Sequence, residues 1–126
     1  MAQSKHICII DDDPICVYTT RLLIESIGKF DQISIFSNGK EAFQGLSQLI
    51  GTTEFPQIIL LDINMPIWDA WDFLDELNKE EEHISSSIYV VSSSNDPEDE
   101  QRAKTYTQVK GFLLKPIQLD QLNFDL

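Results

Sequence analysis

Four polar groups follow short apolar runs in this sequence, and their residue types suit phosphoryl transfer. They are Asp11-Asp12-Asp13, Asp62, Ser92-Ser93-Ser94 and Lys115-Pro116. Carboxylates from Asp11, Asp12 and Asp62 at one edge would repel one another unless a cation lay among them, and hard oxygen ligands suit Mg²⁺. Lys115 adds positive charge for a phosphoryl group, and Ser92 adds a hydroxyl donor. In-line phosphoryl transfer needs these parts, because it depends on positioning and charge neutralisation.

Each group also has an ordinary structural explanation when it is taken alone. Asp13 before Pro14 suits a helix N-cap, and Asp62 suits a turn. Lys115 could be a solvated lysine before a helix-starting proline, and the serines could form a polar loop. Because all four groups follow apolar runs, we interpret them together as one site.

Apolar runs alternate with segments of helical periodicity, which predicts alternating strands and helices. The expected strands are His6 to Ile10, Gln32 to Phe36, Gln57 to Leu61, Ser87 to Val91 and Gly111 to Leu114. Four of these runs are almost entirely apolar, as a parallel sheet covered on both faces requires. The second run alternates in part and suits a sheet edge.

Helix signals fall between the expected strands. The expected helices run from Asp13-Pro14 to about Gly28, from Asn38 onward, from Trp71 to Glu81, from Glu98 to Tyr106, and briefly after Pro116. We expect the first helix to pack through one apolar face that contains Ile15, Tyr18, Leu22, Leu23 and Ile27. Five strand–helix units favour a doubly wound α/β fold with a five-stranded parallel sheet. Function in such sheets gathers at the carboxyl ends of the strands, where the four polar groups lie.

Composition limits the classes of partner. The chain has 126 residues and a formal net charge of -12, which suit one domain that does not bind nucleic acid or anionic membranes directly. No apolar run approaches the roughly 20 residues that span a bilayer, and no signal-peptide pattern opens the chain. We therefore expect a cytoplasmic protein. Cys8 and Cys16 lack metal-ligand spacing and are expected as buried, reduced thiols.

Longer segments around the polar groups carry a family resemblance. They are Ile9-Ile10-Asp11-Asp12-Asp13-Pro14, Leu60-Leu61-Asp62-Ile63-Asn64-Met65-Pro66, Val90-Val91-Ser92-Ser93 and Gly111-Phe112-Leu113-Leu114-Lys115-Pro116. These segments resemble the response-regulator receiver domains of two-component signalling, over nearly the whole chain. The resemblance implies a single receiver domain over residues 1–126 with the flavodoxin-like strand order 2-1-3-4-5. It also implies Mg²⁺ held by Asp11, Asp12, Asp62 and the backbone carbonyl of Asn64.

The resemblance also assigns the chemistry. Asp62 would be the phosphoacceptor and would take a phosphoryl group from a phosphohistidine of a sensor histidine kinase or a histidine phosphotransfer protein. Lys115 and Ser92 would contact the phosphoryl oxygens, and Pro116 would be cis. Ser92 and Phe112 would switch the face of the fourth helix, fifth strand and fifth helix for a downstream protein reader. Because water hydrolyses the acyl phosphate, the domain would be a self-resetting switch rather than an enzyme.

Three residues depart from the family pattern or are unusual in it. Ala70 stands where the family commonly has Gly, so a positive φ there would cost about 1 kcal/mol or the loop would differ. Trp71 suits helix packing. Trp68 suits either packing or an exposed position near the site, as a contact or a lid.

Two other functions stay open. The run Asp11-Asp12-Asp13 resembles the motif of haloacid-dehalogenase-like phosphatases, in which Asp11 would be the nucleophile and Asp13 the acid/base. A pseudo-receiver would keep the fold as an interaction module without phosphorylation. The sequence also leaves open whether the chain is a stand-alone or excised receiver, and whether phosphorylation drives homodimer formation through the last helices.

Overall fold

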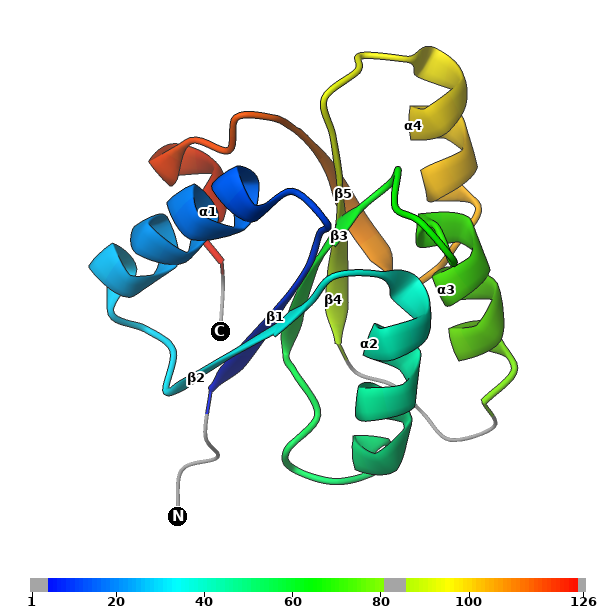
Figure 1. Cartoon of the computed structure of the whole chain (residues 1–126), viewed down its shortest axis with the longest axis horizontal. Helices are drawn as coiled ribbons and strands as arrows, with labels where there is room; N and C mark the ends of the chain where they lie inside the picture. Colours follow the sequence, from blue (N-terminus) through cyan, green and yellow to red (C-terminus); the bar gives the residue numbers. More distant parts are fainter. Residues whose placement is uncertain (1–4, 81–85, 125–126) are drawn as a thin grey trace.

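Five parallel strands form one sheet in the computed structural model, which describes residues 5–80 and 86–124 (Figure 1). The strands are β1 (His6–Ile10), β2 (Gln32–Phe36), β3 (Ile58–Asp62), β4 (Ser87–Ser92) and β5 (Val109–Leu114). Their order across the sheet is β2-β1-β3-β4-β5, which confirms the predicted order. Strand order reverses between β1 and β3, so the ends of these two strands mark the switch point of the sheet.

The central strands are apolar because helices cover both faces of the sheet. Every residue of β1 and β3 is buried, and the parallel register places Ile10 beside Leu61. Side chains of β1 alternate between two cores, as the period of a strand requires. Cys8 and Ile10 belong to one core cluster, and Ile7 and Ile9 belong to the other.

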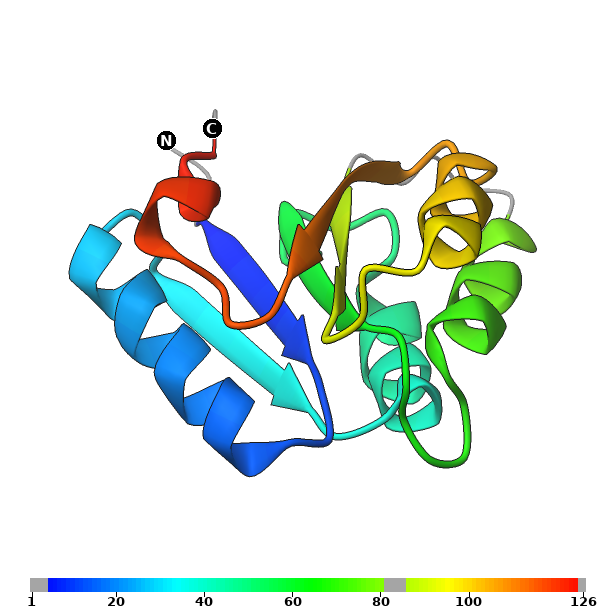
Figure 2. The same cartoon turned by 90° about the horizontal axis from the view of Figure 1, so that it is seen from above.

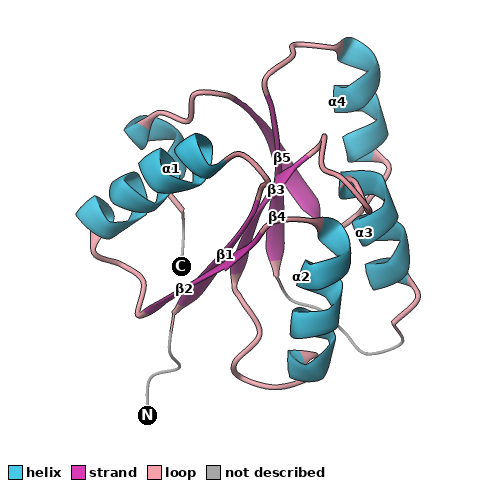
Figure 3. Ribbon diagram, in the orientation of Figure 1, coloured by secondary structure: helices cyan, strands magenta, loops and turns pink. Residues whose placement is uncertain are grey.

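Four α-helices flank the sheet in the described part of the chain. They are α1 (Pro14–Ile27), α2 (Gly39–Leu46), α3 (Ala70–Asn78) and α4 (Pro97–Lys104), and there are two 3₁₀ turns, η1 (Ser47–Leu49) and η2 (Leu119–Leu122). α1 and η2 cover one face, whereas α2, α3 and α4 lie on the other (Figures 2 and 3). The Asp13 side chain caps α1 by accepting a 3.0 Å hydrogen bond from the Ile15 N–H, as predicted.

The predicted buried face of α1 is partly wrong. Leu23 and Ile27 pack against the core as expected. The residues wrongly predicted to face the core are Ile15, Tyr18 and Leu22, which are 74%, 64% and 48% exposed. Thr20 and Ile24 are buried instead. The helix carries apolar residues around most of its circumference, so periodicity alone does not determine which side faces the sheet.

The predicted helix ends also need correction. The fifth helix is only the 3₁₀ turn η2, which is closed by a 3.0 Å hydrogen bond from the Gln121 N–H to the Gln118 carbonyl. α3 ends at Asn78, and its predicted end at Glu81 lies outside the described residues. α4 ends before Tyr106, which is nevertheless buried.

Among the helices that the structure describes, none has the length and apolar character that a membrane span requires.

Candidate functional site

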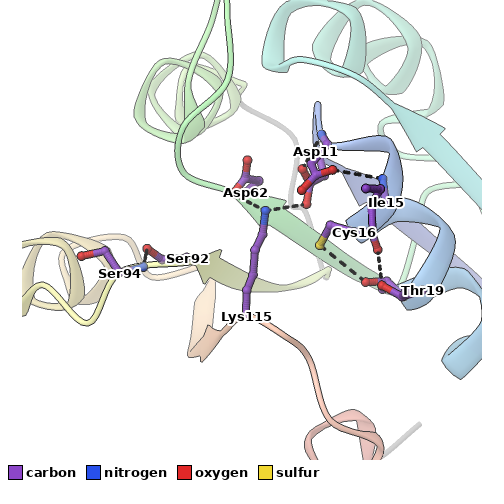
Figure 4. A network of polar contacts seen from close by, with 10 residues as sticks. Asp11, Ile15, Cys16, Thr19, Asp62, Ser92, Ser94 and Lys115 are labelled. Atoms are coloured by element: carbon purple, nitrogen blue, oxygen red, sulfur yellow. Dashed lines mark hydrogen bonds and ion pairs between the residues drawn. The ribbon is translucent and has the colours of Figure 1, made fainter.

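Residues at the carboxyl ends of β1, β3 and β5 meet at one edge of the sheet. Asp11 follows β1, Asp62 is the last residue of β3, and Lys115 follows β5. The Lys115 Nζ lies 3.0 Å from Asp11 Oδ2 and 3.2 Å from Asp62 Oδ1 (Figure 4). The ammonium group therefore bridges two carboxylates from strands that are adjacent in the sheet.

Asp12 completes a group of three carboxylates. Ligand atoms of Asp11, Asp12 and Asp62 all lie within 4.8 Å of one another. Asp11 and Asp62 are buried, whereas Asp12 is exposed, so the group opens to solvent on one side. Burial and the nearby Asp11 charge raise the pKa of Asp62 from 3.8 to about 6, although Lys115 opposes this shift. One ammonium thus leaves negative charge uncompensated at this edge.

Lys115 is held between these carboxylates by its own backbone as well as by charge. Its N–H donates a 2.8 Å hydrogen bond to the Ser92 carbonyl, and its peptide bond to Pro116 is cis. Burial disfavours the charged amine, but the hydrogen bond to Asp11 and the charge of Asp62 outweigh it and raise the pKa of Lys115. Lys115 is accordingly a fixed positive charge at neutral pH.

Ser92 lies at the end of β4, but its hydroxyl does not contact the carboxylates. The Ser92 side chain is buried, and its Oγ accepts a 3.0 Å hydrogen bond from the Ser94 N–H. Figure 4 shows Ser92 and Ser94 apart from the Lys115 ammonium. Within the described residues, no hydrogen bond joins the Ser92 hydroxyl to Asp62 or Lys115. The structure therefore brings four of the predicted side chains together and leaves this hydroxyl turned away.

Phe112 lies on β5, partly buried against the core. It borders a cavity of about 210 Å³ between α4 and β5, whose lining includes Ala103, Lys104 and Val109. The cavity therefore leaves open space beside the Phe112 ring, next to α4.

The loop from β3 to α3 carries the strain that the sequence suggested for Ala70. Ala70 is buried in the first position of α3 and needs no positive φ. Ile67 has a φ of 69° instead, which is unfavourable for a β-branched residue. Asn64 lies exposed in the same loop. Trp68 is half-buried, with its ring centroid 5.9 Å from that of Phe43 on α2, so it packs against α2 rather than covering the site as a lid.

Cys16 was not recognised as a neighbour of the site from the sequence. The thiol is half-buried rather than buried, and its Sγ lies 3.9 Å from Thr20 Oγ1. Burial and a hydrogen bond with Asp11 raise the pKa of Cys16 to about 11, so the thiol stays protonated at neutral pH. Its position on the first turn of α1 beside Asp11 was the available signal, but apolar flanking residues obscured it. Cys8 is fully buried, and both cysteines are free, as predicted.

Comparison with known proteins identifies the family. The family model of the response regulator receiver domain matches residues 7–125. This chain belongs to that family. Receiver domains of response regulators are signalling switches that bind Mg²⁺ at an acidic pocket, and the cluster of Asp11, Asp12 and Asp62 is such a group of acids.

Individual relatives give the same result. The nitrate/nitrite response regulator protein NarL of Escherichia coli K12 is 32% identical over 120 residues, covering 92% of this receiver domain and 50% of NarL. The probable C4-dicarboxylate response regulator DctR of Halalkalibacterium halodurans is 28% identical over 118 residues, covering 93% of this chain and 47% of DctR. The chain thus spans about half the length of these curated relatives. The crystal structure of a two-component response regulator from Cytophaga hutchinsonii matches with a TM-score of 0.86 and 29% identity, over 97% of this chain and 93% of that chain.

Proposed function

We propose that this receiver domain accepts a phosphoryl group on Asp62 from a phosphohistidine, with Mg²⁺ bound at the same edge of the sheet. The observation that carries the proposal is the Lys115 ammonium, which lies 3.0 Å from Asp11 and 3.2 Å from Asp62. The phosphoryl donor is a sensor histidine kinase or a histidine phosphotransfer protein.

The residues present fit a magnesium ion. Three carboxylates lie within 4.8 Å of one another, and the raised pKa of Asp62, about 6, reflects burial and charge that Lys115 alone does not offset. Asp11, Asp12, Asp62 and the backbone carbonyl of Asn64 would hold the ion, with water filling the remaining positions. When bound, Mg²⁺ neutralises negative charge on the phosphoryl oxygens.

In the proposed step, Asp62 is the nucleophile. A carboxylate oxygen of Asp62 attacks phosphorus while Lys115 lies 3.2 Å from the Asp62 Oδ1. An O–P bond forms as the P–N bond to the histidine breaks, and the imidazole leaves and takes up a proton. Lys115 stays charged and neutralises a phosphoryl oxygen as the charge moves from donor to acceptor. Water later hydrolyses the aspartyl phosphate, and we expect Asn64 and Ser94 to influence its lifetime.

The proposed switch is the hydroxyl of Ser92. It now accepts a hydrogen bond from the Ser94 N–H. Turning toward a phosphoryl oxygen would exchange this contact for a charge-assisted bond of about 1.5–3 kcal/mol. Phe112 would then enter the vacated space beside β4, and the face formed by α4, β5 and η2 would change for a downstream protein reader.

The donor protein must cover the edge that carries Asp62. A groove of about 380 Å³ beside this edge is lined by Asp11, Asp12, Tyr18, Arg21 and Ile35, among others. The exposed side chains of Ile15, Tyr18 and Leu22 continue from the groove along α1. An apolar surface of this kind beside the phosphoacceptor suits contact with the phosphohistidine protein.

Intact-protein mass measurement tests the proposal. The chain is incubated with acetyl phosphate, with MgCl₂ or with EDTA, and compared with Asp62→Asn. We expect one phosphoryl adduct that requires metal and is absent from the variant.

The same experiment separates the alternatives. No adduct on the native chain would indicate a pseudo-receiver. An adduct that survives Asp62→Asn and disappears with Asp11→Asn would indicate the phosphatase chemistry. The latter is disfavoured because both carboxylate oxygens of Asp11 are engaged: Oδ1 accepts a 2.9 Å hydrogen bond from the Asp13 N–H, and Oδ2 pairs with Lys115.

A further inference from the structure

The loop from β3 to α3 is attached to the start of α2 by a backbone hydrogen bond. The N–H of Gly39, the first residue of α2, donates to the Trp68 carbonyl at 3.1 Å. N–H groups in the first turn of a helix have no partner within the helix. Here the Gly39 N–H instead binds Trp68, a residue of the loop that follows Asp62.

The contact is so close that only glycine fits at position 39. A Cβ on Gly39 would lie 2.9 Å from the Trp68 carbonyl oxygen, 3.0 Å from the Trp68 Cβ and 3.1 Å from the Asp69 carbonyl oxygen. Two of these three atoms belong to backbone, which cannot rotate away as a side-chain end can. The φ of Gly39 is not positive, so the backbone conformation does not call for glycine at this position. Glycine is required because a side chain would collide with Trp68 and Asp69.

A second contact holds the same loop residue one helical turn further along α2. The Trp68 ring lies 5.9 Å from the Phe43 ring, at an angle of 44° between their planes. We call Gly39, Phe43 and Trp68 together the α2 clamp. The α2 clamp joins the loop to α2 through a backbone hydrogen bond, a close backbone contact and a ring contact.

The backbone of the loop is strained beside Trp68, so contacts with other parts of the chain must stabilise this conformation. Ile67 has a φ of 69°, and its side chain is 70% exposed, so burial of that side chain does little to offset the strain. At the other end of the loop, the Ile63 carbonyl accepts a 3.1 Å hydrogen bond from the Ala70 N–H. The segment between these ties carries Asn64.

We propose that Gly39 and Trp68 are positioning residues for the magnesium site, because the α2 clamp fixes the loop that presents the Asn64 carbonyl. The inference rests on the proposed function, in which that carbonyl is a metal ligand. Groups that orient metal ligands without touching the metal commonly change affinity by about 10- to 100-fold when they are altered.

The matched test compares Gly39→Ala with Gly45→Ala by Mg²⁺ titration of the full chain, followed by amide NMR shifts. Both variants add one methyl group to α2, and a Cβ on Gly45 would lie 2.8 Å from side-chain atoms of Phe36 rather than from backbone atoms. We expect Gly39→Ala to bind Mg²⁺ about tenfold more weakly and to accept phosphoryl groups from acetyl phosphate more slowly. Gly45→Ala should keep the native affinity.

Trp68→Ala and Trp68→Phe provide a second comparison if Gly39→Ala does not fold. Trp68→Ala should weaken Mg²⁺ binding, and Trp68→Phe should restore most of it by keeping a ring against Phe43. The inference is overturned if the folded Gly39→Ala and Trp68→Ala variants bind Mg²⁺ as the native chain does, or if Gly45→Ala weakens binding equally. A native chain that binds no Mg²⁺ would instead refute the proposed function, and the inference with it.

Discussion

The indole of Trp71 on α3 stacks on the ring of Tyr106, with centroids 6.0 Å apart and planes inclined by 17°. The guanidinium of Arg102 on α4 lies 4.7 Å from the Trp71 ring centroid, and the Tyr106 hydroxyl donates a 2.7 Å hydrogen bond to Asp75. α4 itself buries only Ala103 among its residues. These contacts join α3 to Arg102 of α4 and to Tyr106, which follows that helix.

Removing the Trp71 ring should destabilise the fold and loosen α4. We expect Trp71→Ala to lower the free energy of unfolding by about 3 kcal/mol or more, because a buried aromatic ring and its stacking are lost. Urea denaturation measures this loss, and amide hydrogen exchange should accelerate in α4 more than in β1. Trp71→Phe is the control and should lose markedly less. Unchanged exchange in α4 of Trp71→Ala would show that other contacts hold that helix.

Because the pKa of Asp62 is raised, we expect replacement of Asp62 to stabilise the folded chain in a pH-dependent way. A carboxyl with a pKa of about 6 in the folded chain and 3.8 otherwise holds its proton more tightly when folded, so stability falls as pH rises through this window. In EDTA, Asp62→Asn should be more stable than the native chain above about pH 7, by up to about 2 kcal/mol. The difference should disappear near pH 4.

Thermal unfolding across pH measures this effect, with Asp120→Asn as the matched control. Asp120 is an exposed carboxylate on η2, so its removal should leave the pH profile unchanged. A native chain and Asp62→Asn of equal stability at all pH values would mean that Lys115 fully compensates the Asp62 charge.

The sequence predicted that Asp11, Asp62 and Lys115 lie together because each stands at the carboxyl end of an apolar run. Apolar runs located β1, β3 and β5 within one or two residues, and parallel strands necessarily bring Asp11, Asp62 and Lys115 to one edge. Features that depend on contacts distant in sequence were missed. The rotation of α1 depends on packing against the sheet, so the exposure of Ile15, Tyr18 and Leu22 was predicted wrongly.

The strained residue of the loop from β3 to α3 is Ile67 rather than Ala70, and the strain at Ile67 predicts a stabilising substitution. Ile67 has a φ of 69° with its side chain 70% exposed, whereas Asn tolerates this backbone region better than a β-branched residue. We expect Ile67→Asn to raise the free energy of unfolding by about 1 kcal/mol. Ile15→Asn replaces an equally exposed isoleucine in a helix and should give no gain. Chemical denaturation of both variants makes the comparison.

The exposed residues of α1 predict a variant that separates protein donors from small donors. Tyr18 is 64% exposed and lines the groove that reaches Asp11 and Asp12. We expect Tyr18→Glu to slow phosphoryl transfer from a phosphorylated histidine kinase or phosphotransfer protein about tenfold, because contact residues at interface centres often contribute more than 1 kcal/mol. Transfer from acetyl phosphate should be unchanged, because it needs no protein contact.

Leu119→Glu is the matched control for Tyr18→Glu. Leu119 is 53% exposed on η2, beside Ser26 and Ile27 near the opposite end of α1, so the same change of apolar surface to charge occurs away from Asp62. Both donors should phosphorylate this variant at the native rate. Equal slowing by the two variants with the protein donor would indicate nonspecific repulsion by added negative charge. Slowing of Tyr18→Glu with acetyl phosphate as well would place the effect in the site itself, not in donor docking.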